Sequence, residues 1–179
     1  MRLRRFYRQN GFLEPWIEYD DSELDTTSNS IQVVFHVTEG PPLIIQDVGF
    51  FGPDGGYAVN LFEEGMRERW IDFRDRTSFR TGDRYTEFDR IRIQDRVLSW
   101  LKDRGYAFPI LETETTIDST AFTADIRFTL DPGPRGVFSE ILIEGNESLR
   151  REVILRELPF SIGDRFSQSK LIEGQRQLF

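Results

Sequence analysis

The sequence contains no cysteine and only one histidine among its 179 residues. The absence of cysteine excludes disulfide bonds, thiolate metal sites and a thiol nucleophile, and it leaves the redox compartment undecided. One histidine cannot form a multi-histidine metal site and gives little support to histidine acid–base chemistry. No apolar run approaches the roughly 18 residues of a membrane-spanning helix. These absences leave most enzyme classes poorly supported, and the leading expectation is a chain with no cofactor and no metal site.

Positive charge is also scarce. Lys and Arg together number 23 against 31 Asp and Glu, which gives a net charge of −8. Because a nucleic-acid binder needs a basic surface to neutralise phosphates, we expect no nucleic-acid partner. The first eight residues are basic and lack the apolar stretch of a secretory signal. All basic residues except Lys102 and Lys170 are arginine, which indicates either a compositional bias or a surface that contacts carboxylates or lipid phosphates.

An internal repeat is the most informative feature that the sequence does have. Val37 to Pro42 resembles Leu130 to Arg135, with an offset of 93 residues. Thr81 to Thr86 resembles Ile162 to Ser167, with an offset of 81. The shorter second offset means that the middle copy carries about twelve extra residues ahead of its second helix.

The phase of the repeat predicts the domain boundaries. Residues 1–40 are expected to be the C-terminal half of one repeat, residues 41–135 a complete repeat, and residues 136–179 the N-terminal half of a further one. We therefore expect the chain to be an excerpt of a longer protein. The two half-repeats are complementary, so they predict head-to-tail self-association, unless each half packs against the central repeat instead.

Alternation of polar and apolar residues predicts the strands of a repeat. Residues 43–51 and 137–144 are strand candidates at the start of a repeat. Residues 122–131 alternate cleanly, as in a strand with one buried and one wet face. Residues 110–117 carry charge and threonine on both faces, which is typical of an edge strand protected against unwanted pairing.

Two helices are expected between the first strand and the last two. Asn60 resembles an N-cap of the first helix, while Thr86 and its counterpart Ser167 occupy the N-cap of the second. The second helix is expected to bury Phe88, Ile91, Leu98 and Leu101. The resulting fold class is α+β: repeated β-α-α-β-β units, each a three-stranded mixed sheet covered on one face by two helices.

This unit resembles the POTRA (polypeptide-transport-associated) domain. The last segment carries the clearest similarity, in Gly145-Asn146, in the run Gly163 to Phe166 and in Leu171 to Phe179. The similarity extends over nearly the whole chain and is to tandem POTRA domains of outer-membrane β-barrel assembly and translocation proteins of the BamA/TamA type. The joints between repeats carry a shared motif: Gly40, Pro41, Gly52, Gly133, Pro134, Gly145 and Asn146.

The resemblance implies a non-enzymatic role on the periplasmic side of the bacterial outer membrane. Such domains dock unfolded outer-membrane proteins and accessory envelope proteins and pass clients to the protein's own C-terminal β-barrel, which lies outside this chain. In that family an exposed sheet edge pairs with an incoming strand by β-augmentation. The expected peptide-binding edge strand comprises Ile110, Leu111, Glu112, Thr113, Glu114, Thr115, Thr116 and Ile117, and the Ile17 to Leu24 region is a second candidate.

Two other functions remain open from the residues alone. One is a scaffold for folded accessory envelope proteins, or a division-type POTRA protein, in place of a carrier of unfolded clients. An exposed Trp70 would mark a docking patch for such partners. The other is a carboxylate metal-binding module or enzyme built on Asp20, Asp21, Glu23 and Asp25, although the run lacks the glycine and terminal glutamate of an EF-hand.

Overall fold

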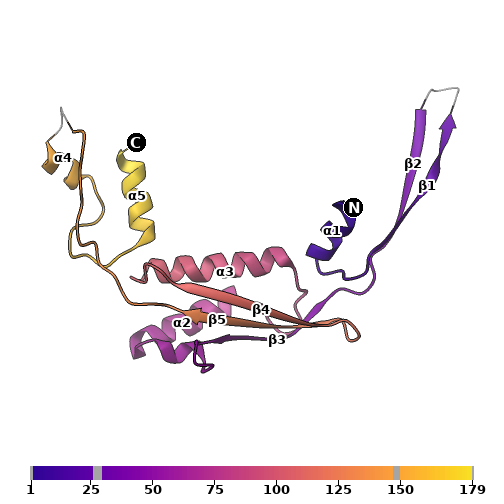
Figure 1. Cartoon of the computed structure of the whole chain (residues 1–179), viewed down its shortest axis with the longest axis horizontal. Coiled ribbons are helices and arrows are strands. Elements are labelled where there is room, and N and C mark those ends of the chain that lie inside the picture. The colour runs from indigo at the N-terminus through magenta and orange to yellow at the C-terminus, as the bar shows by residue number, and fades with distance from the viewer. Residues whose placement is uncertain (1, 26–29, 147–149, 179) are drawn as a thin grey trace. The chain divides into compact units, whose positions relative to one another are not determined.

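The computed structural model describes residues 2–25, 30–146 and 150–178, except for the side chains of residues 21–25 and 32. Helices and strands are both present, as Figure 1 shows, which confirms the α+β class. In chain order the described elements are α1 (Arg2–Gln9), β1 (Trp16–Asp25), β2 (Ser30–Thr38), β3 (Ile44–Phe51), the 3-10 helix η1 (Ala58–Leu61), α2 (Glu64–Thr77), α3 (Glu87–Lys102), β4 (Ile110–Asp118), β5 (Thr123–Asp131), α4 (Arg151–Arg156) and α5 (Gln168–Leu178).

The chain divides into two compact units, each assembled from three segments. The first contains Met1–Gly49, Phe79–Arg92 and Glu114–Arg127, and the second contains Phe50–Ser78, Ile93–Thr113 and Phe128–Phe179. The domain boundaries expected after residues 40 and 135 follow the sequence repeat rather than this division, and they stay a prediction.

A mixed three-stranded sheet has the strand order β3-β5-β4, so β5 is central and β3 and β4 are its edges. The alternation expected in β5 is present. Its side chains are buried at every second position, at Ala124, Ile126, Phe128 and Leu130, while Asp125 and Arg127 are exposed. Burial of one set of alternate residues places the core on a single face of the central strand.

The first helix of the complete repeat begins later than Asn60 indicates. Residues 58–61 form η1, and α2 starts only at Glu64, after an extended N-cap residue, Glu63. Phe62 separates the two elements with extended backbone angles, and its ring is buried beside Trp70 at a centroid distance of 5.3 Å. The prediction that Asn60 caps the helix is therefore wrong, because burial of Phe62 interrupts the helical path.

The expected buried face of α3 is also wrong at its N-terminal half. Phe88 is 72% exposed and Ile91 is 46% exposed. Leu101 is buried as expected, but its companions are Ile93, Val97 and Trp100. Aromatic packing explains the rotation of the helix, since Trp100 stacks on Phe73 at a centroid distance of 4.9 Å and contacts Trp70 edge-on at 5.6 Å.

The β1 and β2 strands form a separate antiparallel two-stranded sheet. The register pairs Trp16 with Thr38 and Asp25 with Ser30, and it shifts between Asp20 and Glu23. Apolar side chains at alternate positions of β2 are all exposed: Ile31, Val33, Phe35 and Val37. Among the described residues this sheet therefore has an apolar face without a covering layer.

The last segment forms its helices but not its expected strand. Residues 139–146 have no regular structure, and only Val137 makes an isolated bridge, to Arg165. In the complete repeat β3 pairs with β5, and this segment pairs with none of the described strands, so the ladder that stabilises a strand is missing. The predicted N-cap Ser167 is confirmed, because its Oγ accepts a hydrogen bond from the amide of Lys170 at 3.3 Å, at the start of α5.

Candidate functional site

The strand expected to accept a partner strand is β4, which contains all eight predicted residues and lies at the edge of its sheet. Its side chains alternate between the core and solvent. Leu111 is buried and Thr113 and Thr115 are half-buried, whereas Ile110, Glu112, Glu114, Thr116 and Ile117 are exposed. The outward positions therefore combine two carboxylates with apolar and hydroxyl groups. Whether a peptide binds here stays a prediction.

The other edge strand, β3, is shielded at both ends by its own chain. Ile44 makes a bridge with Arg84, and Phe51 makes a bridge with Tyr57. None of the isolated bridges found in the described part of the chain involves a residue of β4. Since an incoming strand needs a run of unpaired main-chain groups, β4 is the better of the two edges for strand addition.

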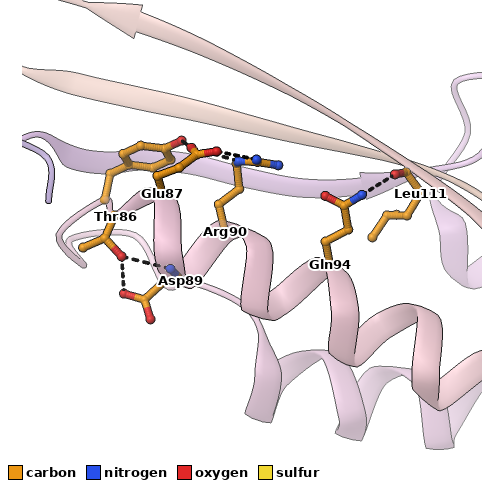
Figure 2. A network of polar contacts seen from close by, with 7 residues as sticks. Thr86, Glu87, Asp89, Arg90, Gln94 and Leu111 are labelled. Atoms are coloured by element: carbon orange, nitrogen blue, oxygen red, sulfur yellow. Dashed lines mark hydrogen bonds and ion pairs between the residues drawn. The ribbon is translucent and has the colours of Figure 1, made fainter. Parts of the chain in front are cut away.

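A polar network at the N-terminal end of α3 holds β4 in place (Figure 2). Gln94 Nε2 donates to the carbonyl oxygen of Leu111 at 3.1 Å, which fastens the start of the strand to the helix. Further along, the Tyr85 hydroxyl donates to Glu87 Oε2 at 2.7 Å. The bond from Gln94 thus tethers the strand to the helix near its start.

The charges of this network are stabilised in fixed states. Burial, and then the hydrogen bond and charge of Glu87, raise the pKa of Tyr85 to about 12, so the phenol stays neutral. The hydrogen bond from Arg90 lowers the pKa of Glu87, and the two side chains form an ion pair. The neutral Tyr85 phenol and the ionised Glu87 carboxylate therefore stabilise the structure, and neither has a pKa suited to proton transfer near neutral pH.

Thr86 caps α3, as the sequence predicts. The amide of Asp89 donates to Thr86 Oγ1 at 3.0 Å, and the same hydroxyl donates to Asp89 Oδ2 at 2.7 Å (Figure 2). This reciprocal pair satisfies one of the free amides at the helix start and fixes the direction in which α3 leaves the turn. The cap and the tether at Gln94 therefore belong to one rigid support for β4.

At the first joint a four-bond main-chain frame surrounds Gly11. The Gly11 carbonyl accepts from the amide of Leu43 at 2.7 Å, and the Leu43 carbonyl accepts from Tyr85 at 2.8 Å. The amide of Ile45 donates to the Asp83 carbonyl and its carbonyl accepts from Gly82, both at 2.8 Å. Gly11 has a φ of +84°, and a Cβ atom there would overlap the Tyr85 carbonyl oxygen, so the position requires glycine.

The second joint repeats this frame bond for bond. Gly105 accepts from Gly136 at 2.7 Å, and Gly136 accepts from Phe166 at 3.0 Å. Phe138 donates to Asp164 at 2.9 Å and accepts from Gly163 at 2.8 Å. The residues correspond at the offsets of the sequence repeat, 94 for Gly105 and 81 for Gly163. The repeat therefore extends to the hydrogen bonds that fasten consecutive repeats together.

None of the residues of the predicted joint motif makes a hydrogen bond of this frame. Gly40, Gly133 and Gly145 have positive φ values of 77°, 64° and 77°, whereas Gly52 does not. A Cβ atom on Gly52 would come within 2.8 Å of the Asp54 carboxylate. Pro41, Pro134 and Asn146 are exposed.

Sequence reasoning placed the joint elsewhere and missed Gly11, Gly82, Gly105 and Gly163. All four have positive φ values. The available signal was that each glycine recurs with the same type of following residue: Gly11-Phe12 as Gly105-Tyr106, and Gly82-Asp83 as Gly163-Asp164.

The remaining sequence candidates do not form a site. His36 is exposed, and its Nε2 lies 2.8 Å from Asp20 Oδ2 across the two-stranded sheet. The side chains of Asp21, Glu23 and Asp25 lie outside the described ones, and no group of three metal-ligating side chains occurs among those described. Trp70 is 1% exposed, so it belongs to the core and cannot mark the docking patch considered above.

Comparison with known proteins agrees with this geometry. Residues 136–179 match the POTRA family, described as a surface antigen variable number repeat. The outer membrane protein assembly factor BamA of Nitratidesulfovibrio vulgaris is 26% identical over 157 residues, 87% of this chain. The last segment therefore matches the POTRA family, and the chain as a whole is similar to assembly factors of the BamA type. It spans 19% of that relative's length.

Solved POTRA structures share the fold. The POTRA3-5 crystal structure of Haemophilus influenzae BamA superposes with a TM-score of 0.64 at 19% identity, over 98% of this chain and 65% of the other. BamA of Haemophilus ducreyi lacking POTRA domains 1-3 gives 0.59 at 19% identity, over 75% of this chain and 23% of the other. Within the described part of this chain, no helix has the length and apolarity to cross a membrane.

Proposed function

We propose that this chain is the periplasmic POTRA module of an outer-membrane protein assembly or translocation factor. It docks unfolded clients by strand addition at β4 and passes them to a membrane β-barrel that belongs to the same protein. The observation that carries the proposal is the position of β4 at the sheet edge, without the bridges that shield both ends of β3. The name of the related assembly factor supports the class of client.

Main-chain pairing at β4 favours weak and reversible binding of clients. A client that arrives in many sequences has to be recognised through its main chain, which all sequences share. Each main-chain hydrogen bond contributes a net of about 0.5–1.5 kcal/mol, and ordering a client residue costs a similar amount. The expected affinity is therefore weak, with a Kd of about micromolar to millimolar. The exposed Glu112 and Glu114 further oppose permanent pairing.

Nuclear magnetic resonance with three peptides tests the proposal. The isotope-labelled chain is titrated with a strand-forming peptide, with a peptide of scrambled order, and with the first peptide N-methylated at every residue. Strand addition uses peptide amides, so the first two should shift the amide signals of residues 110–117 and the methylated peptide should not. The amide signals of β3 serve as the internal control and should stay in place.

Two results contradict strand addition at β4. Equal shifts from the methylated peptide would show recognition through side chains, and shifts at Ile44–Phe51 would assign the other edge. Crosslinking to folded envelope proteins, with none to unfolded clients, would favour the scaffold function over client carriage.

A further inference from the structure

A pocket lined by arginine lies against α2 and α3, away from β4 in sequence and in role. Its cavity volume is about 370 Å³. Arg69 and Arg76 come from α2, Arg96 comes from α3, and Arg104 follows the end of α3. A volume of this size fits a small ligand or one headgroup rather than a strand.

Helical spacing explains why these side chains meet. Arg69 lies three and four residues before Asp72 and Phe73, and Arg76 lies four and three residues after them, so the four share one face of α2. Arg96, Trp100 and Arg104 recur at intervals of four residues along α3 and the turn that follows it. The α2 helix, which supplies one side of the pocket, has 14 residues, whereas α4 of the last segment has six.

The positive charge of the pocket is only partly compensated. Arg76 forms an ion pair with Asp72. The ion pairs made by described residues include none from Arg69, Arg96 or Arg104. Burial and, to a lesser extent, repulsion by Arg69 lower the pKa of Arg104, with Asp103 acting in the opposite direction. Three arginines that make no ion pair with a described residue stand out on a chain of net charge −8.

The wall of the pocket is aromatic and holds Arg104 in a fixed orientation. The guanidinium carbon of Arg104 lies 4.0 Å from the ring centre of Trp100, and its Nη1 donates to the Trp100 carbonyl at 3.0 Å. Phe73 stacks on Trp100 at a centroid distance of 4.9 Å. The hydroxyl of Thr77, a lining residue that is 7% exposed, is buried and has no hydrogen-bond partner among the described residues. A prearranged guanidinium loses less entropy when an anion binds.

We propose that this pocket binds a phosphate group. Guanidinium groups recognise oxyanions through paired N–H donors, and several arginines match the several oxygens of a phosphate. A phosphate monoester carries a charge of about −1.5 to −2, which neutralises more of the three unpaired cations than a single carboxylate does. The ligand is either a soluble phosphate ester or the phosphate of a lipid headgroup, and this chemistry is separate from main-chain pairing at β4.

A phosphate titration with charge-matched variants tests the site. Inorganic phosphate and glycerol phosphate are added at constant ionic strength, and the indole N–H signal of Trp100 is followed by nuclear magnetic resonance. The test variant is Arg69→Gln/Arg96→Gln, in two exposed side chains. The control is Arg74→Gln/Arg92→Gln, which removes two arginines that are paired with Asp75 and Asp89 and lie outside the pocket.

We expect the Trp100 signal to shift saturably with phosphate. The phosphate Kd from this titration should rise by about tenfold or more in the test variant and by less than about twofold in the control. If phosphatidylglycerol vesicles bind the wild-type chain and the control but not the test variant, the ligand is a lipid headgroup. If glycerol phosphate binds and the vesicles do not, the ligand is a soluble phosphate ester. A linear shift without saturation, an equal loss in both variants, or tighter binding of acetate than of phosphate would overturn the proposal.

Discussion

At the scale of single residues, two glycines with the same backbone conformation differ in their surroundings. Gly11 and Gly82 have φ values of +84° and +92°. A methyl group on Gly82 meets nothing within 4 Å, whereas one on Gly11 overlaps the Tyr85 carbonyl oxygen. Alanine substitution at these two glycines therefore separates the free-energy cost of an unfavourable φ from the cost of a steric clash.

Gly82→Ala is expected to lower the free energy of unfolding by about 1–2 kcal/mol, the cost of a left-handed conformation for a residue with a Cβ atom. Gly11→Ala carries that cost and a main-chain displacement as well, so it should lower the free energy by more. Urea unfolding of both variants measures the difference. Equal effects would mean that the joint relaxes without strain.

The ion pair of Glu87 predicts a pH dependence. Arg90 lowers the pKa of Glu87 below its ordinary value of 4.5, so the pair contributes stability above that pH. The contribution is lost as the pH falls through the lower folded-state value. Glu87→Gln should therefore unfold more readily than the wild type near neutral pH, and the gap should shrink below about pH 4. A gap of constant size in urea unfolding would indicate that the hydrogen bond to Tyr85, not the charge, is responsible.

At the scale of elements, α3 and β4 act as a supported edge. Gln94→Ala removes the hydrogen bond that fastens Leu111 to the helix. We expect faster hydrogen exchange at the start of β4, because local opening no longer has to break that bond, and little change in β5. The matched control is Gln46→Ala in β3, a glutamine exposed on the other edge strand. Unchanged hydrogen-exchange protection in β4 would show that Gln94 does not stabilise this strand.

The sequence predicts local features of this chain better than features that depend on long-range packing. The β5 alternation and the caps at Thr86 and Ser167 are local signals, and each is present in the structure. The α3 face fails because Phe88 is as apolar as a core residue, yet long-range stacking with Trp100 decides which side of the helix faces inward. The arginine pocket was equally hidden, because arginine is frequent on every helix and only the packed structure shows which arginines share a face.

At the scale of the whole molecule, the exposed face of β2 predicts self-association. Apolar side chains at Ile31, Val33, Phe35 and Val37 have no cover among the described residues. The half-repeat expected in residues 136–179 of a second copy is the candidate cover for this face. We expect the mass in light scattering to rise with concentration, and Phe35→Asp to abolish the rise because a buried carboxylate is costly. The control Tyr57→Asp changes an exposed aromatic residue outside this sheet and should leave the rise intact. A constant monomer mass would contradict self-association.

The two joints are closed by amides and carbonyls of the backbone, which every amino acid provides. Mutation can therefore change almost any side chain near a joint without altering the bonds that define it, provided that the few glycines survive. An array of such units can diversify its surfaces for different cargo over evolutionary time while the couplings between its links keep their geometry.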